Sequence, residues 1–341
     1  MRRAMLYEQL EGGQVQCQLC QRRCRISPGK TGYCGTRLNQ DGTLYSLVYG
    51  QISSVAVDPI EKKPLCHFHP TSQVLSLGTF GCNFRCIHCQ NYSISHVEPG
   101  TERYLPRSRK LTPEETVELA KRYDCSGIAW TYNEPTVWFE YSLDTAKVAK
   151  PAGLYTCFIT NGYLTDKALD ALGPYLDAFR VDVKGFTTEF YRKLASVTEW
   201  KGILDIAVRA KEKWDMHVEV VTNIIPTMND DDEQLEALAR WIVEDLGELT
   251  PWHVTRFIPY LELSHLPSTP VETLDRAREI GLAQGLRFVY VGNVPGHGAE
   301  STYCYDCGKL AIRRVGYQTR IVGVQDGKCA YCGADLNIRQ P

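Results

Sequence analysis

A long alternation between short β-type runs and amphipathic stretches constrains the fold of this chain more than any other feature. It extends from Val74 to Val294. Strands and helices that alternate in this way form a parallel sheet with helices outside it. The pattern therefore predicts an α/β fold, namely a partial or near-complete parallel (β/α) barrel of the TIM type. The seven predicted strands are Val74–Leu77, Gly127–Thr131, Tyr155–Thr160, Phe179–Val183, His217–Val221, His253–Ile258 and Arg287–Val291.

Helix-start signals lie between several of these strands. Residues 112–115 read Thr-Pro-Glu-Glu, which is a capping box with proline at the first helical position, and the helix is expected to end near Tyr123. Four acidic residues precede the periodic stretch Gln234–Leu246, where they interact favourably with the positive end of the helix dipole. A second Thr-Pro pair begins at Thr269 and predicts a helix that reaches Ala283.

Polar residues follow the predicted strands at their carboxyl ends. In a parallel barrel these ends meet on one face, where the chemistry collects. Each residue alone is a weak signal, because Asn-Gly is normally a turn and an Asp/Lys pair is usually a salt bridge. Their occurrence after seven successive strands predicts a functional site. Cys82 follows the first strand, and the later strands are followed by Asn133 and Glu134, Asn161, Asp182 and Lys184, Asn223, Tyr260 and Asn293.

The loop after the first predicted strand contains three cysteines, Cys82, Cys86 and Cys89, in a C-x₃-C-x₂-C spacing. So short a loop can place three thiolates around one metal centre. A structural zinc or a fully ligated iron–sulfur cluster needs four ligands, so one metal position is left open for chemistry. Two alternatives are a three-cysteine zinc site completed by a distant histidine, and cysteines that only pack.

This loop resembles the signature of the radical S-adenosylmethionine (SAM) superfamily. In that family the three cysteines hold a [4Fe–4S] cluster, and the fourth iron binds the amino and carboxylate groups of SAM. An electron from the cluster splits SAM into methionine and a 5′-deoxyadenosyl radical, which abstracts hydrogen from a substrate. The resemblance implies that Cys82, Cys86 and Cys89 are the catalytic cluster ligands.

The resemblance also assigns residues that would contact the amino group and the adenine of SAM. Asn133 and Glu134 resemble the Gly-Gly-Glu element that binds the SAM amino group, with Glu134 as the acceptor, although the two glycines are missing here. His88 stands where the family usually has an aromatic residue, and its imidazole can still stack on adenine.

The resemblance implies further SAM-binding residues near the ribose, carboxylate and adenine groups. Asn161 and the Asp182–Lys184 pair resemble elements that line the ribose and carboxylate side of SAM in glycyl-radical activases, and Asn223 and Tyr260 would flank the ribose and adenine. A carboxylate for the ammonium, a lysine for the carboxylate and amides for the hydroxyls suit a zwitterionic nucleoside.

Four cysteines near the N-terminus, Cys17, Cys20, Cys24 and Cys34, are sufficient to close a second metal site. The residues around them are mostly polar and turn-forming. A small segment with little core of its own usually needs a metal for stability. We expect structural zinc, with an auxiliary [4Fe–4S] cluster as the alternative, since both accept four thiolates. Disulfides are the third and weakest option.

The C-terminal fifty residues contain two Cys-x₂-Cys-Gly motifs with 21 residues between them, and the intervening sequence is typical of a hairpin. Cys304, Cys307, Cys329 and Cys332 therefore predict a zinc ribbon closed by four thiolates. The default role of such a closed site is structural.

We expect three domains. These are a four-cysteine metal-binding segment at residues 1–70, the barrel at 71–298 and the zinc ribbon at 299–341. Asp58–Pro64 is typical of a turn. The run Cys66–His69 holds a cysteine and two histidines that can bind a metal, but such a run before a strand more often packs locally.

Composition narrows the possible partners and location. The 341 residues carry a formal net charge of −2. A protein that binds nucleic acid through its phosphates is normally basic, so nucleic acid is disfavoured as the main partner. The basic run at residues 103–110 is expected to be a solvated loop. We find no apolar stretch long enough for a signal peptide or a membrane helix, and we expect a cytoplasmic protein. Fourteen cysteines in such a chain favour metal sites over disulfides.

The similarity extends beyond the cysteine loop to one subgroup, the AmmeMemoRadiSam-system radical SAM enzymes, which are similar to pyruvate formate-lyase activating enzymes. It rests on the N-terminal cysteines, residues 46–50, 58–64 and 290–297, and the ribbon. The subgroup name reflects genes beside those for Memo-type and AMMECR1-type proteins, which are therefore candidate partners. An electron donor of the flavodoxin or ferredoxin type is also implied.

Three functional hypotheses follow. The first is a radical SAM enzyme that abstracts hydrogen from a peptide, a protein or a small-molecule metabolite. The second narrows this activity to a glycyl-radical enzyme activase. The third is a zinc-rich binding or scaffold protein without catalysis. The complete cysteine triad and the presence of Glu134 favour the first two over the third.

Overall fold

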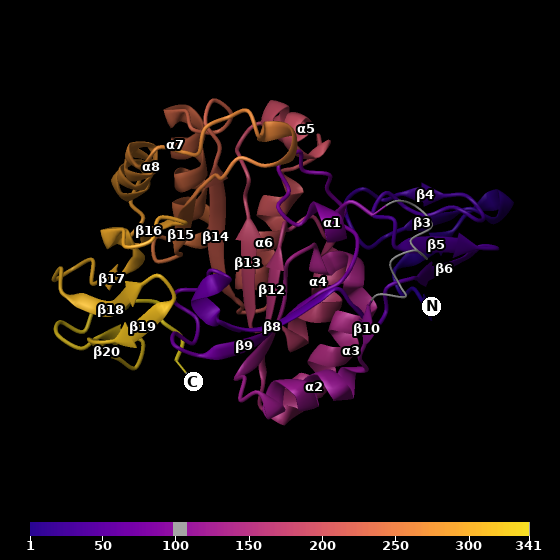
Figure 1. The fold of residues 1–341 in the computed structure, drawn as a ribbon, viewed down its shortest axis with the longest axis horizontal. Coiled ribbons are helices and arrows are strands. Elements are labelled where there is room, and N and C mark those ends of the chain that lie inside the picture. Colours follow the sequence, from indigo (N-terminus) through magenta and orange to yellow (C-terminus); the bar gives the residue numbers. More distant parts are fainter. Residues whose placement is uncertain (98–107, 341) are drawn as a thin grey trace.

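The computed structural model describes residues 1–97 and 108–340, and an eight-stranded sheet forms its centre (Figure 1). The strand order is β16-β15-β14-β13-β12-β11-β9-β8, with β8 antiparallel and the other neighbours parallel. The seven predicted strands are therefore confirmed as one open parallel sheet. The strands are β8 (Ser54–Pro59), β9 (Gln73–Gly78), β11 (Gly127–Trp130), β12 (Tyr155–Thr160), β13 (Ala178–Asp182), β14 (His217–Ile224), β15 (Trp252–Arg256) and β16 (Val289–Gly292).

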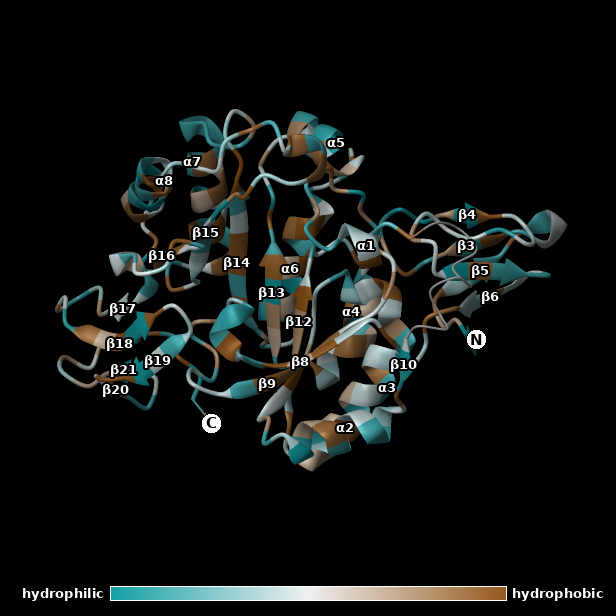
Figure 2. Cartoon of the chain, in the orientation of Figure 1, coloured by the Kyte–Doolittle hydropathy of each residue, from teal (hydrophilic) through white to brown (hydrophobic). Residues whose placement is uncertain are grey.

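The central strands are buried along almost their whole length. Every residue of β11 and β12 is buried, as are seven of the eight residues of β14. Strands of parallel sheets read as continuous apolar runs because both of their faces are covered. Figure 2 shows the same concentration of hydrophobic residues along these strands.

The long helices lie between successive strands of the sheet. The capping box at α2 is confirmed, because Thr112 Oγ1 accepts from the Glu115 N–H at 3.1 Å and the Thr112 N–H donates to Glu115 Oε2 at 2.7 Å. The helices are α1 (Tyr92–Ser95), α2 (Pro113–Arg122), α3 (Phe139–Ala149), α4 (Asp166–Leu172), α5 (Thr188–Ala195), α6 (Gly202–Glu212), α7 (Asp232–Trp241) and α8 (Val271–Ala283).

The start of α8 differs from the expectation. Pro270, not Thr269, is its N-cap. Thr269 Oγ1 instead accepts from the Phe257 N–H at 2.8 Å and donates to the Ile224 carbonyl at 2.6 Å. The hydroxyl therefore connects the carboxyl ends of the neighbouring strands β14 and β15. Because it makes these long-range hydrogen bonds, it does not cap α8.

Small antiparallel sheets form the N-terminal part and lie on the opposite side of the central sheet from the C-terminus (Figure 1). Their apolar residues, such as Val15 and Leu19, belong to the same hydrophobic core as the central sheet. The strands here are β1 (Arg2–Arg3), β2 (Tyr7–Gln9), β3 (Val15–Cys17), β4 (Arg25–Ile26), β5 (Arg37–Gln40), β6 (Thr43–Ser46), β7 (Gln51–Ile52) and β10 (Arg109–Lys110).

Two expected turns or loops contain regular structure. Asp58 and Pro59 end strand β8, and Ile60–Lys62 form a 3-10 helix, so the stretch expected as a turn is partly ordered into the central sheet. In the basic run, residues 103–107 lie outside the described residues, while β10 at its end pairs with β7 instead of forming a free loop.

The C-terminal strands pack against the last strand of the central sheet. Phe288 and Tyr290 share a core with Ala311 and Ile312 of β18. The predicted hairpin is confirmed by β18 and β19, which pair antiparallel. The strands are β17 (Thr302–Tyr303), β18 (Leu310–Val315), β19 (Gln318–Ile321), β20 (Val324–Gln325) and β21 (Lys328–Cys329). Among the described residues, none of the helices combines the length and apolar character required to cross a bilayer.

Candidate active site

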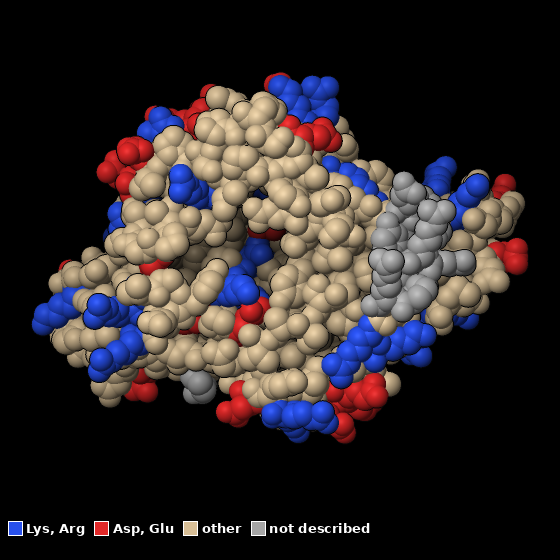
Figure 3. All heavy atoms as spheres, in the orientation of Figure 1, with Lys and Arg blue, Asp and Glu red and all other residues tan. Residues whose placement is uncertain are grey.

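A cavity of about 640 Å³ lies at the carboxyl ends of the parallel strands and continues along the sheet toward the C-terminal strands. Figure 3 shows its mouth near the middle of one face, with basic and acidic side chains around it. Loops far apart in the sequence thus place most of the predicted site residues on one cavity. Those in its lining are Cys82, Cys86, Cys89, Asn133, Glu134, Asn161, Asp182, Lys184 and Asn223.

The cysteine loop is held in place by two asparagines from neighbouring strands. Asn133 Oδ1 accepts from the Thr79 N–H at 3.0 Å, and its Nδ2 donates to the Gly81 carbonyl at 2.7 Å. Asn161 Nδ2 donates to Asn83 Oδ1 at 2.8 Å. Both side chains, which the resemblance assigned to SAM, therefore act first as positioning residues for the cysteine loop.

The electrostatic surroundings of the thiols are uneven. Burial raises the pKa of Cys82 well above its ordinary value, and the charge of Glu134 adds to this effect. Burial also raises the pKa of Cys86 to about 11, although nearby Lys184 opposes the shift. Binding to a metal would favour the thiolate form of both residues. Lys184 places a positive charge close to Cys86, so it complements the negative charge of a thiolate ligand there.

Glu134 is almost fully buried, and its two oxygen atoms differ. Its Oε1 accepts three hydrogen bonds, from the N–H and the hydroxyl of Thr136 at 2.9 and 2.6 Å and from Thr160 Oγ1 at 2.7 Å. Its Oε2 accepts one, from the Asn161 N–H at 2.8 Å. A carboxylate has about four acceptor positions, so Oε2 can still accept from a ligand. Burial raises the pKa of Glu134, and a bound cation would offset that shift.

The residue two positions before Glu134 has an unusual backbone. Tyr132 stands where the family element has glycine, and its φ is +72°, in the left-handed region that favours glycine. Its carbonyl accepts from Asn91 Nδ2 at 2.7 Å, and its hydroxyl donates to Asp58 Oδ2 at 3.2 Å. These bonds hold the backbone in a glycine-like turn without the glycine.

Asp182 and Lys184, which also line the cavity, form an ion pair at 3.3 Å, and Arg180 also contacts Asp182. Burial alone would raise the pKa of Asp182, but the charges of Arg180 and Lys184 outweigh it and lower that pKa. Burial would likewise lower the pKa of Lys184, whereas Asp182 and Cys86 outweigh it and raise that pKa. Both groups are therefore charged at neutral pH.

Two predicted residues lie outside the described lining of this cavity. His88 lines a smaller neighbouring cavity with Asp182, Lys184 and Asn223. Burial lowers the pKa of His88 to about 3, so its ring is neutral, and its Nδ1 has no hydrogen-bond partner among the described residues. Tyr260 is 37% exposed, and its ring lies 6.0 Å from that of Tyr92.

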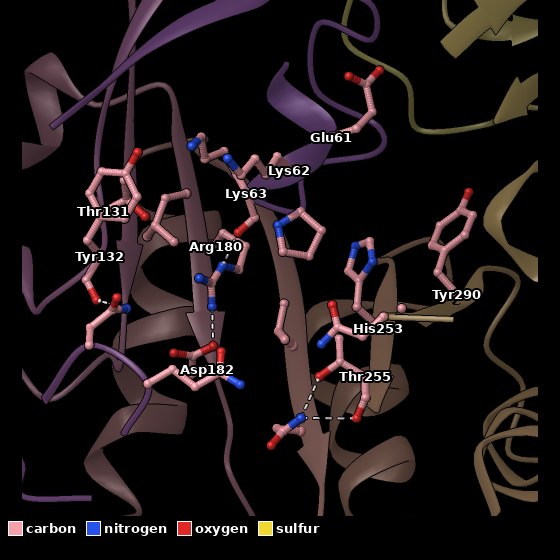
Figure 4. A pocket seen from close by; sticks show the side chains of 18 of the residues that line it. Glu61, Lys62, Lys63, Thr131, Tyr132, Arg180, Asp182, His253, Thr255 and Tyr290 are labelled. Atoms are coloured by element: carbon pink, nitrogen blue, oxygen red, sulfur yellow. Dashed lines mark hydrogen bonds and ion pairs between the residues drawn. The ribbon is translucent and has the colours of Figure 1, made fainter. Parts of the chain in front are cut away.

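Sequence analysis missed a polar group at the inner end of the cavity (Figure 4). Lys63 Nζ pairs with Asp58 Oδ2 at 2.7 Å, and Arg180 Nε donates to the Lys63 carbonyl at 2.9 Å. The available signal was a charged residue inside an apolar strand, since Arg180 interrupts the apolar sequence of β13 although it is buried there.

A second missed group surrounds Glu219. Its oxygens accept from the backbone N–H groups of Cys66 and His67 at 3.0 and 2.8 Å, and contact the His217 and His253 rings at 3.0 and 2.6 Å. His67 is also bonded to Tyr290 at 2.5 Å, so Cys66 and His67 pack against residues far away in the chain and not only locally. The ligand atoms of Cys66, Glu219 and His253 lie within 4.8 Å of one another.

The predicted ribbon cysteines converge. The ligand atoms of Cys304, Cys307, Cys329 and Cys332 all lie within 4.8 Å of one another, and the closest sulfur pairs are 3.5 and 3.7 Å apart. The glycine after each Cys-x₂-Cys has positive φ, +69° and +80°, as expected of a tight turn around a metal. This four-cysteine group is zinc-ribbon-like.

An open parallel sheet with polar groups gathered at the carboxyl ends of its strands is the architecture of an α/β enzyme. The family model described as the Radical SAM superfamily matches residues 77–242. The chain belongs to the radical SAM superfamily, whose members use a [4Fe–4S] cluster and SAM.

Three relatives extend this comparison. An uncharacterized protein of Methanocaldococcus jannaschii is 44% identical over 340 residues, which cover 99% of both chains. The pyruvate formate-lyase-activating enzyme of Clostridium pasteurianum is 25% identical over 61% of this chain and 87% of its own. The pyruvate formate-lyase 1-activating enzyme of Escherichia coli is 24% identical over 51% of this chain and 71% of its own.

Proposed function

We propose that Cys82, Cys86 and Cys89 hold a [4Fe–4S] cluster with one open iron, and that the enzyme abstracts hydrogen from a substrate in the 640 Å³ cavity. With SAM bound, the cluster supplies a 5′-deoxyadenosyl radical for that step. The single observation that carries this proposal is the convergence of the three thiols, Glu134 and Lys184 on one cavity.

The cluster fits the cysteine loop in two respects. Three free thiols line the same cavity, and a fourth protein ligand is not required when a substrate atom completes the site. Their sulfur atoms also do not form one of the described groups within 4.8 Å, unlike the ribbon cysteines. Thiolates that bind different irons stand farther apart than thiolates around one ion, which favours a cluster over a single zinc.

The polar side chains of the cavity can hold the charged end of SAM. Glu134 Oε2 has capacity for an ammonium hydrogen bond, because the Asn161 N–H occupies only one of its acceptor positions. Lys184 can bind the carboxylate by turning from Asp182, to which it is bonded at a rather long 3.3 Å. Asn223 extends an amide into the same cavity for a ribose hydroxyl.

A second candidate is a glycyl-radical enzyme activase, whose substrate is a protein backbone. The observation that favours it is the similarity to two activating enzymes of pyruvate formate-lyase. It predicts a radical signal on a glycine of a partner protein after incubation with SAM and reductant. Memo-type and AMMECR1-type proteins are the first partners to test, and a flavodoxin or ferredoxin type protein is the proposed electron donor.

The test is release of 5′-deoxyadenosine from SAM by the anaerobically reconstituted and chemically reduced protein. We expect release that depends on the three loop cysteines. The absence of release from a chain with its full iron and sulfide content would overturn the proposal.

A further inference from the structure

The N-terminal cysteine site consists of Cys17, Cys20, Cys24 and Cys34. Cys17 ends β3, Cys20 forms a β-bridge with Leu164, and all four cysteines line one small cavity. Four thiols thus surround one space next to the central sheet.

The spacing of the sulfur atoms separates a zinc ion from a larger group. Zinc binds thiolates at about 2.3 Å, which places tetrahedral sulfur atoms about 3.8 Å apart. The ribbon cysteines match this value, with closest pairs at 3.5 and 3.7 Å. Among the described residues, the groups within 4.8 Å are the ribbon and the trio around Glu219. No three sulfur atoms of the N-terminal cysteine site meet that limit, as is also true of Cys82, Cys86 and Cys89.

A buried arginine provides an independent sign of a ligand. Arg37 is 1% exposed, lines the same cavity and pairs with Glu140 at 2.6 Å. Its Nε is buried and has no hydrogen-bond partner among the described residues. A buried donor without a partner costs about 1–3 kcal/mol, so its retention calls for an acceptor. The sulfur atoms of an anionic cluster are suitable acceptors, and such hydrogen bonds tune cluster potentials.

We propose that Cys17, Cys20, Cys24 and Cys34 hold a second, fully ligated [4Fe–4S] cluster, and that the unpartnered Nε of Arg37 donates a hydrogen bond to it. A zinc ion fits the same four residues by number but not by spacing. Because all four irons would have cysteine ligands, this cluster leaves no open position for SAM.

The proposed cluster would lie against the loop that carries Cys82. Asn83 lines the cavity of the N-terminal cysteine site, and its carbonyl accepts from Arg22 Nε at 2.5 Å. A methyl group built on Gly81 would come within 2.6 Å of the Cys34 carbonyl. The loop that carries Cys82 therefore packs directly against the segment that carries Cys34, so the two cysteine sites are neighbours in the fold.

The test uses the full chain with all three loop thiols removed, Cys82→Ala, Cys86→Ala and Cys89→Ala. After anaerobic reconstitution with ferrous iron and sulfide, iron, sulfide and zinc are counted and the reduced protein is examined by electron paramagnetic resonance. We expect about four irons, about four sulfides and one zinc per chain, with a cluster signal. A variant that holds two zinc ions and no iron would overturn the proposal.

A second pair of variants controls for misfolding of the triple variant. Their readout is metal content, so it tests the N-terminal cluster independently of SAM cleavage. Cys20→Ser, with the loop thiols intact, should lower the iron content from about eight to about four per chain. Unchanged iron in Cys20→Ser would contradict the proposal. Cys125→Ser is the matched control, since Cys125 is buried but lies outside the three cysteine groups, and its iron and zinc should equal those of the parent protein. Failure of SAM cleavage alone would leave these metal counts unaffected.

Discussion

Glu134 Oε2 accepts the backbone N–H of Asn161 at 2.8 Å and thereby joins the loops after two neighbouring strands of the sheet. The same carboxylate lines the active-site cavity. One side chain thus fixes the local backbone and offers the remaining acceptor position to a ligand. Variants of this residue must therefore separate its structural bonds from its charge.

Glu134→Gln should weaken SAM binding about 10- to 100-fold, because a charge-assisted hydrogen bond contributes about 1.5–3 kcal/mol. Glutamine keeps the shape but removes the charge and replaces one acceptor oxygen with an amide NH₂ group, which only donates. Equilibrium dialysis with SAM on the oxidised protein measures the effect, and iron content serves as the control. An unchanged Kd with a full cluster would contradict the assigned role. Glu134→Ala should also destabilise the fold, since four hydrogen bonds are lost.

Cys86→Ser should abolish assembly of the loop cluster and the cleavage of SAM, because a hydroxyl is a poor substitute for a thiolate ligand. The zinc content expected from Cys304, Cys307, Cys329 and Cys332 should not change, since that group lies in a separate core. Metal analysis and 5′-deoxyadenosine release measure the two results. Retained SAM cleavage would show that the cluster ligands have been wrongly assigned.

Gly81→Ala should destabilise the protein strongly. Its φ is +85°, and a methyl group would lie 2.4 Å from Thr36 Cγ2 and 2.6 Å from the Cys34 carbonyl. Gly153→Ala is the matched control, because φ is +78° there but nothing lies within 4 Å of the added methyl group. We expect Gly153→Ala to cost about 1 kcal/mol and Gly81→Ala at least about 2 kcal/mol more. Equal denaturation midpoints would mean that the loop and the N-terminal segment do not contact.

The free energy of unfolding should depend on pH through His67. Burial lowers its pKa to about 3, so the folded state keeps the ring neutral while the unfolded chain binds a proton below about pH 6.5. The contribution of His67 to the free energy of unfolding is therefore fully present above pH 6.5. It decreases as the pH falls below 6.5, by up to about 1.4 kcal/mol per pH unit.

The His67 effect is isolated by comparison with His67→Gln between about pH 5 and 6.5. On acidification the free energy of unfolding should fall more steeply in the parent protein than in the variant. The difference in slope should correspond to the uptake of close to one additional proton on unfolding of the parent protein. Parallel slopes would mean that His67 titrates alike in the folded and unfolded chain.

The sheet and the gathering of polar residues at the carboxyl ends of its strands were predictable from the sequence. Runs such as Tyr155–Thr160 are rich in apolar and β-branched residues, because both faces of the strand are buried. Such a run can be recognised in the sequence alone. The polar residues at the strand ends were placed on one cavity by the parallel topology alone.

The inner polar groups were not predictable, because their partners lie far apart in the chain. Arg180 is bonded to the Lys63 carbonyl, 117 positions away, and Glu219 to the Cys66 N–H, 153 positions away. A single sequence carries no pairing information of this kind.

The central claim is that the cluster of the cysteine loop has one iron open to SAM. Electron–nuclear double resonance on the reduced protein, with SAM labelled by ¹⁵N in the amino group and ¹⁷O in the carboxylate, measures this directly. We predict hyperfine coupling from both labels in the parent protein and from neither in Cys86→Ser. A fully reduced cluster without coupling to either label would contradict the account.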